Sequence, residues 1–205
     1  MKKVCLVNGS LRGKQASSSE FLKDIDLRLP DTEYSKTVIN VKAKVKDSYP
    51  EDILQSLAGA DAIIFIFPLH NYGLPGALMR LIEEYYAYRK PGDDRKETRV
   101  YTIVNCAFPR PEKTCGEATR VIQNLCRRLS LNWRFAVCIG TGPVVVLTKK
   151  IPFLYPKLKK AYTELASDIR NSDKERKNDY FIKPVIPESI IAAIKRYYEK
   201  KGRMR

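Results

Sequence analysis

The chain has 205 residues and a mass of 23.5 kDa, which suits one domain able to bury a core without disulfides or metal ions. Hydrophobic residues make up 44% of it, as in ordinary globular proteins, and no apolar run approaches the roughly 20 residues that a membrane-spanning helix requires. The net charge of +15 indicates a partner or ligand of opposite sign, for which nucleic acid is the usual candidate.

The amino terminus predicts a strand, a loop and a helix in that order. Residues 3–8 are apolar with β-branched character and are too few for a secretory signal, so we expect a cytoplasmic protein. In residues 17–29, Phe21, Leu22 and Ile25 recur at helical spacing behind a run of serines suited to capping.

Strands and helices continue to alternate along the chain. The sequence predicts a strand at 36–41, a helix at 50–59, a strand at 62–67, a helix at 76–88, a strand at 99–104, a helix at 115–131 and a strand at 134–139. This alternation predicts a doubly wound α/β fold with five parallel strands in the flavodoxin-like order 2-1-3-4-5. Ligands of such sheets bind at the carboxyl ends of the strands near the topological switch point, so the loops after strands one, three and four should matter.

The last quarter of the chain is basic. From Lys149 onward there are 16 Lys and Arg against 7 Asp and Glu. Mixed runs such as DKERKND at 173–179 are typical of solvated surface, which favours a weakly anion-attracting surface over a nucleic-acid interface. This region also predicts helices at 155–170 and 187–200, and we expect the second to pack on the domain or on a partner subunit rather than on a membrane.

The cysteines and the one histidine argue against a metal site. Five cysteines form an odd number without a Cys-x-x-Cys pair. Cys5 and Cys138 lie in apolar runs, where cysteine packs as a small hydrophobe. Cys115 precedes a helix, which can lower a thiol pKa, but nothing in the sequence ties it to His70 as a catalytic partner. We therefore predict no metal site and no catalytic side chain.

The first loop has the composition of a phosphate site. A helix amino terminus offers unpaired N–H groups and partial positive charge, serine hydroxyls add donors, and Arg12 adds a fixed charge. The loop lacks the spacing of a P-loop and of a Gly-x-Gly-x-x-Gly dinucleotide turn. Serine-rich helix starts also occur for capping alone, so this loop needs the support of the others.

Two further loops carry a specific resemblance. The third strand runs into Pro68-Leu69-His70, with Pro75 seven residues after Pro68, and the fourth runs into Asn105-Cys106-Ala107-Phe108-Pro109. Together with the Gly-Ser-x-Arg loop, these motifs resemble the NAD(P)H-dependent FMN reductase group of flavodoxin-like proteins. The resemblance covers residues 3–143.

The resemblance implies an FMN cofactor held by three loops. Its phosphate is expected on Ser10, Arg12, Ser17, Ser18 and Ser19. The isoalloxazine ring is expected between Pro68, Leu69, His70, Asn71 and Tyr72 on one side and Asn105, Cys106, Ala107 and Phe108 on the other. Two residues depart from the group's pattern, because His70 stands where Tyr is usual and Ala107 where Gly is usual.

The sequence therefore predicts an FMN-dependent oxidoreductase that passes electrons from NADH or NADPH to a flavin, quinone or similar acceptor. It is expected to be a homodimer, with residues 1–148 as the FMN-binding domain and 149–205 as a basic helical extension packed on it. Two alternatives remain open: an FMN-binding electron-transfer or regulatory protein without efficient NAD(P)H turnover, and a nucleic-acid-binding domain suggested by the charge alone.

Overall fold

The computed structural model describes residues 1–41, 48–89, 97–151, 154–172, 175 and 177–183 and the single positions 189, 193 and 196. Within them, one parallel sheet has the strand order β2-β1-β3-β4-β5-β6. Its strands are β1 (Lys2–Asn8), β2 (Tyr34–Asn40), β3 (Ala62–Pro68), β4 (Arg99–Asn105), β5 (Asn132–Ile139) and β6 (Tyr180–Ile182). The helices are η1 (Gly13–Gln15), α1 (Ser17–Asp26), α2 (Glu51–Ala58), α3 (Gly76–Arg89), α4 (Pro111–Thr114), α5 (Gly116–Arg128), α6 (Gly142–Thr148) and α7 (Pro156–Asn171).

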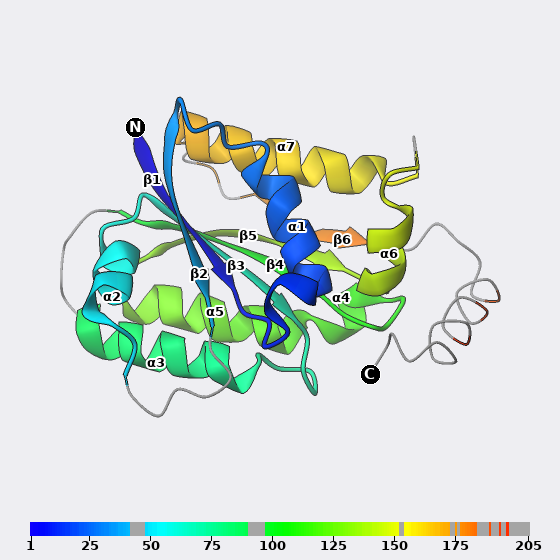
Figure 1. The fold of residues 1–205 in the computed structure, drawn as a ribbon, viewed down its shortest axis with the longest axis horizontal. Coiled ribbons are helices and arrows are strands. Elements are labelled where there is room, and N and C mark those ends of the chain that lie inside the picture. The colour runs from blue at the N-terminus through cyan, green and yellow to red at the C-terminus, as the bar shows by residue number, and fades with distance from the viewer. Residues whose placement is uncertain are drawn as a thin grey trace.

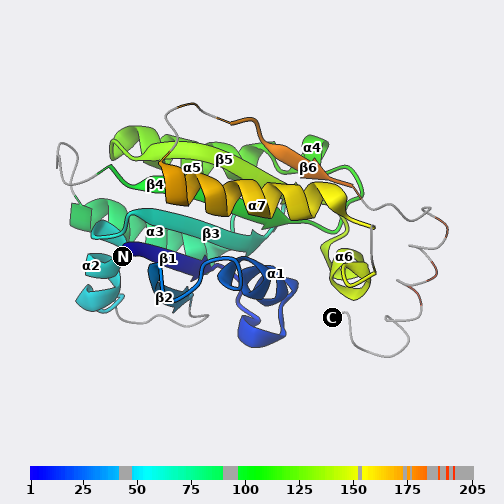
Figure 2. The same cartoon turned by 90° about the horizontal axis from the view of Figure 1, so that it is seen from above.

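Helices cover both faces of the sheet (Figures 1 and 2). One hydrophobic cluster joins the sheet to α2, α3 and α5, and a second joins it to α1, α6 and α7. The doubly wound α/β fold predicted from the alternation of strands and helices is therefore confirmed.

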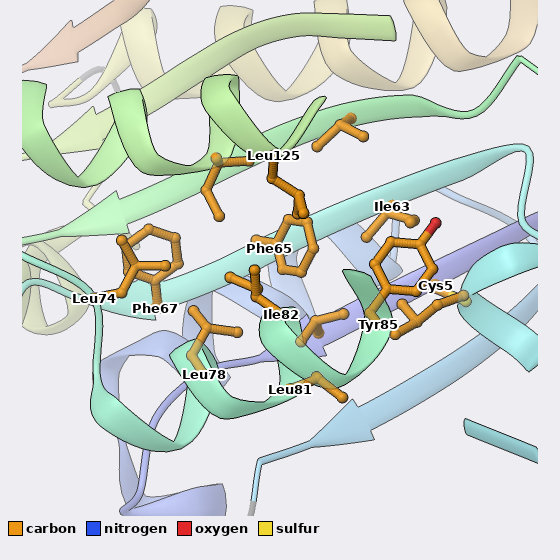
Figure 3. Packing of buried hydrophobic residues seen from close by; sticks show 14 of the residues in the cluster. Cys5, Ile63, Phe65, Phe67, Leu74, Leu78, Leu81, Ile82, Tyr85 and Leu125 are labelled. Atoms are coloured by element: carbon orange, nitrogen blue, oxygen red, sulfur yellow. The ribbon is translucent and has the colours of Figure 1, made fainter. Parts of the chain in front are cut away.

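The central strand β3 shows why the fold has two cores. Its sequence AIIFIFP is buried over the first six residues, as expected for a parallel strand covered on both sides. Because side chains alternate along a strand, Phe65 and Phe67 enter the cluster under α3 and α5 (Figure 3), while Ile64 and Ile66 enter the other. Each face thus receives large apolar side chains.

The prediction of five strands was one strand short. The order 2-1-3-4-5 is present, and β6 extends it by pairing with β5 at the edge of the sheet. Only Tyr180, Phe181 and Ile182 form this strand, directly after the charged run 173–179. Such a short strand has no periodicity of its own and forms because β5 offers it a pairing edge.

Helix α6 was not predicted, because its sequence GPVVVLT is rich in β-branched residues that favour strands. Thr141 adopts a left-handed conformation with φ 46°, and a proline then stands in the first turn, which suits a helix start. Val144 and Val145 of this helix are buried, and Val145 belongs to the cluster beneath α1 and α7. The predicted helix at 187–200 lies almost entirely outside the described residues.

A buried ion pair fastens α7 to the sheet. Asp168 accepts two hydrogen bonds from Arg134 of β5, at 2.8 Å from Nε and 2.9 Å from Nη2, and one of 2.6 Å from the Tyr101 hydroxyl. All three residues are at most 1% exposed. Burial alone would raise the pKa of the Asp168 carboxyl, but the hydrogen bonds from Arg134 and Tyr101 outweigh it and hold that pKa below its usual value.

Helix α7 also closes the core on its side of the sheet, with Leu158, Tyr162 and Leu165 buried against it. The division into a domain at 1–148 and an extension stays a prediction. Among the described residues, no helix combines the length and apolar character needed to cross a membrane.

Replacing Asp168 by Asn should lower the free energy of unfolding by about 3–5 kcal/mol, because the buried Arg134 guanidinium would lose the carboxylate that accepts two of its hydrogen bonds. Urea unfolding followed by circular dichroism measures the loss. Glu117→Gln is the matched control, since it removes a carboxylate whose pair with Arg120 is exposed to solvent, and it should leave stability nearly unchanged.

The same pair predicts part of the acid sensitivity of the fold. The pKa of Asp168 is lower in the folded state than in the unfolded state. The ionised carboxylate therefore adds its full contribution to the free energy of unfolding above the unfolded-state pKa of about 3.9. This contribution is lost as pH falls through the lower folded-state pKa. Asp168→Asn should lack this part of the acid-induced loss. If the free energy of unfolding fell as much at acid pH in the variant as in the unmodified protein, this account would be contradicted.

Candidate functional site

A cleft of about 590 Å³ opens at the carboxyl edge of the sheet. It lies where β1, β3 and β4 end, with the start of α6 beside them. The residues that line it are Ser10, Leu11, Arg12, Gln15, Ala16, Ser17, Ser18, Pro68, Leu69, His70, Asn105, Cys106, Ala107 and Pro143. The parallel sheet thus brings the three predicted loops together into one site.

Ten of the fourteen residues singled out in the sequence line this cleft, and Ser19, Asn71, Tyr72 and Phe108 do not. The cleft also includes Leu11, Gln15, Ala16 and Pro143, which sequence reasoning missed. Pro143 follows β5, so a fourth loop contributes to the site. Its Gly140-Thr141-Gly142-Pro143 sequence is the signal that could have pointed to it.

One end of the cleft is polar and lies at the start of α1. The helix begins after Ala16, and no side chain caps it, so the serines do not have the capping role that their position suggested. Arg12 is exposed, and its guanidinium has no hydrogen-bond or ion-pair partner in the described part of the chain. An uncapped helix start beside an unpaired guanidinium is a favourable environment for an anion.

Two buried asparagines hold this polar end in place. Asn8, at the end of β1, donates to the Ser19 hydroxyl at 3.1 Å and accepts from the Ser10 backbone N–H at 3.2 Å. Asn105, at the end of β4, donates to the Ser18 hydroxyl at 2.8 Å. The asparagines are 1% and 4% exposed, so these bonds are shielded from water.

The three serines therefore have different roles. The Ser19 hydroxyl donates to the Gly13 carbonyl at 2.5 Å and accepts from Asn8, which leaves it no free proton for a ligand. The Ser18 hydroxyl accepts from Asn105 and can still donate its proton. Ser17 lines the cleft and is partly exposed.

Gly9 lets the first loop approach the core closely. A Cβ atom there would lie 2.7 Å from Cβ of Phe67 and 2.8 Å from Cδ2 of Leu78, closer than real side chains pack. The Gly9 N–H also donates to the Ile66 carbonyl at 2.8 Å. The path of the loop therefore depends on the missing side chain.

The other end of the cleft is formed by the loops after β3 and β4. Pro68 and Leu69 pass into a tight turn in which the backbones of His70 and Gly73 exchange hydrogen bonds of 3.0 and 2.7 Å. Positive φ angles at Asn71 (44°) and Tyr72 (63°) give this turn its direction, and His70 is exposed at the cleft.

Tyr72 and Phe108 contact each other rather than the cleft. Their rings stack with centroids 5.8 Å apart and planes 14° from parallel, joining the loop after β3 to the loop after β4. Exposed fractions of 54% and 46% leave part of each ring in solvent.

The loop after β5 is tied to the loop after β4. The Thr141 N–H donates to the Phe108 carbonyl at 2.9 Å, and the Gly142 N–H donates to the Cys106 carbonyl at 2.8 Å. Thr141 is 5% exposed, and its hydroxyl has no hydrogen-bond partner among the described residues. Buried polar groups normally have a hydrogen-bond partner, so this hydroxyl is able to bond a ligand beside it.

The thiols beneath the cleft are unsuited to nucleophilic chemistry. All five cysteines are buried and free. A hydrogen bond with Cys106 lowers the pKa of Cys115, but Cys138 and burial outweigh it and raise that pKa to about 12, so the helix start gives no reactive thiolate. Interaction with Cys115 and burial also raise the pKa of Cys106. Within the described ranges, no three His, Cys, Asp or Glu side chains lie together as a metal site would require.

Residues 2–108 match the model of a family described as having a flavodoxin-like fold. The match spans half of the chain and contains the first three cleft loops. The protein therefore belongs to this family of flavodoxin-like proteins. No curated relative matches the chain in sequence.

Solved structures extend the likeness beyond residue 108. An FMN-dependent NADH-azoreductase from Bacillus anthracis str. Ames Ancestor, in complex with FMN, is 15% identical with a TM-score of 0.59, covering 83% of this chain and 100% of that one. The apo form of an NADH:FMN oxidoreductase (EMOB) is 8% identical with a TM-score of 0.63, covering 85% and 92%. An NAD(P)H:quinone oxidoreductase from Methanothermobacter marburgensis is 14% identical with a TM-score of 0.55, covering 86% and 98%. At these identities the likeness concerns the fold.

Replacing Gly9 by Ala should destabilise the protein by about 1–3 kcal/mol, because the added methyl group forces the first loop away from Phe67 and Leu78. Urea unfolding measures the change. Gly76→Ala is the control, since a Cβ there would meet no atom within 4 Å and Ala favours the helix that begins at that residue. Equal stability of the two variants would contradict the proposed close packing of the loop.

Proposed function

We propose that this protein is an FMN-dependent oxidoreductase that passes electrons from a nicotinamide to a flavin, quinone or similar acceptor. The observation that carries the proposal is the composition of one cleft at the carboxyl edge of the sheet. An unpaired guanidinium and an uncapped helix start lie at one end, and apolar side chains with loop backbone lie at the other. A ligand with an anionic tail and a flat ring matches both ends.

The residues present fit FMN. Arg12, Ser10 and Ser17 would hold the phosphate with the first N–H groups of α1, and Ser18 would add its remaining proton. Pro68, Leu69, Cys106 and Ala107 would hold the ring, and His70 would stand at its rim. The hydroxyl of Thr141, buried without a partner among the described residues, adds a donor near this end. The bound flavin would accept a hydride from a nicotinamide and pass the electrons on.

The geometry changes the roles predicted for part of the ring site and for one residue of the phosphate site. Tyr72 and Phe108 would form an outer wall across two loops, since they stack on each other outside the cleft lining. Ser19 would act through Asn8 and Gly13 as a support of the phosphate loop rather than as a phosphate ligand.

Solved structures with similar folds support the same class of activity. They are named FMN-dependent NADH-azoreductase, NADH:FMN oxidoreductase and NAD(P)H:quinone oxidoreductase. We keep NADH and NADPH as alternative donors, a homodimer as the assembly and the cytoplasm as the location. The electron-transfer protein without efficient NAD(P)H turnover remains the second candidate, and the high positive charge keeps it open.

Purified protein mixed with FMN and desalted should retain the two flavin absorbance bands, and these should bleach on anaerobic addition of NADPH or NADH. Retained bands that neither nicotinamide bleaches would favour the electron-transfer candidate. Loss of all flavin on desalting, with no binding in a titration, would contradict both candidates.

Arg12→Ala should weaken FMN binding about tenfold or more, because a charge-assisted contact with phosphate is lost. Fluorescence quenching of FMN on titration with protein measures the dissociation constant. Arg120→Ala removes the same charge from α5, outside the cleft, and should leave the constant unchanged. Equal weakening in both variants would show that only the net charge matters.

A further inference from the structure

A second hollow lies at the edge of the sheet, between β6 and the start of α7. It has a volume of about 380 Å³ and shares no lining residue with the cleft. Its lining residues are Leu154, Tyr155, Pro156, Lys157, Phe181, Ile182 and Lys183. We call it the edge groove.

The strand beside the edge groove has an open side. β6 is the last strand of the sheet and pairs only with β5 in the described part of the chain (Figure 2). An edge strand presents backbone N–H and C=O groups to which another extended segment can add. The groove therefore offers main-chain hydrogen bonding next to a side-chain pocket.

The floor of the edge groove is apolar and firmly held. Phe181 is 38% exposed, whereas Tyr155 and Ile182, which also line the groove, are 3% and 2% exposed. The Tyr155 hydroxyl and the Thr148 hydroxyl lie 2.9 Å apart in a hydrogen bond that links the groove to α6. An apolar side chain entering the groove would meet a preformed surface and would cover the exposed part of Phe181.

The rim of the edge groove is cationic. Lys157 is exposed and has no ion-pair or hydrogen-bond partner among the described residues. Lys183 is 60% exposed and pairs with Glu112 at 2.9 Å, a surface pair that an incoming carboxylate can replace. The first turn of α7 carries no acidic residue, so Glu112 is the carboxylate that an incoming anion would displace from the rim.

We propose that the edge groove binds an extended acidic segment of a partner protein, which adds as a strand along β6. Apolar side chains of this segment would cover Phe181, and its carboxylates would pair with Lys157 and Lys183. The chain's own end fits less well, because residues 184–205 contain six Lys and Arg against two Glu and would place like charges together. The proposal does not depend on the flavin site.

The test uses an eight-residue peptide of alternating glutamate and valine, labelled at its amino terminus with a fluorophore, and the full-length protein. Anisotropy at low salt should show saturable binding, and a peptide of alternating lysine and valine should bind at least tenfold more weakly. In amide NMR spectra the glutamate peptide should shift resonances of residues 180–183 and leave those of the cleft loops unchanged.

The variant Lys157→Gln/Lys183→Gln should bind the glutamate peptide about tenfold more weakly, since both rim charges are lost. Lys159→Gln/Lys160→Gln has the same net charge and changes two exposed lysines of α7 outside the groove, so it should bind like the unmodified protein. Equal weakening in the two variants, shifts confined to the cleft, or no binding would overturn the proposal. FMN titration of the same samples separates this outcome from failure of the proposed function.

Discussion

The hydrogen bond from Asn105 to the Ser18 hydroxyl joins the end of a central strand to the start of α1, and the candidate site depends on this link. Asn105 also donates to the Phe67 carbonyl at 3.1 Å, so one buried amide connects β4, β3 and α1. Asn8 has the same function between β1, α1 and the first loop. Because these amides are shielded from water, their hydrogen bonds fix the loops firmly enough to shape a cleft before a ligand arrives.

The second half of the chain completes this frame. The ion pair between Asp168 and Arg134 carries a cost of burying charge, which the two hydrogen bonds between them and the third from Tyr101 offset. The pair sets the position of α7 on the sheet and thereby the position of the edge groove at the start of that helix. The cleft and the edge groove both lie at the carboxyl ends of the strands, because α7 begins where strands of a parallel sheet end.

Part of the protein's positive charge lies beside the two hollows. Among the described residues, Arg12 lies at the polar end of the cleft, and Lys157 and Lys183 lie at the rim of the edge groove. In both places the cations adjoin an apolar surface. A ligand that combines negative charge with an apolar body would therefore suit both proposed sites.

The sequence by itself determined the alternation of strands and helices and three of the four loops of the cleft. Continuous apolar runs and amphipathic spacing are local signals, and a parallel sheet necessarily brings its strand ends to one edge. Only the tertiary structure decided that the Ser18 hydroxyl keeps a free proton and the Ser19 hydroxyl does not, because their partners include asparagines at the ends of two strands. It also decided that Tyr72 stacks on Phe108, that the three residues of β6 form a strand, and that Asp168 is buried with Arg134. Each of these features joins residues from different elements of the fold, and contacts between elements leave no periodic pattern in the sequence.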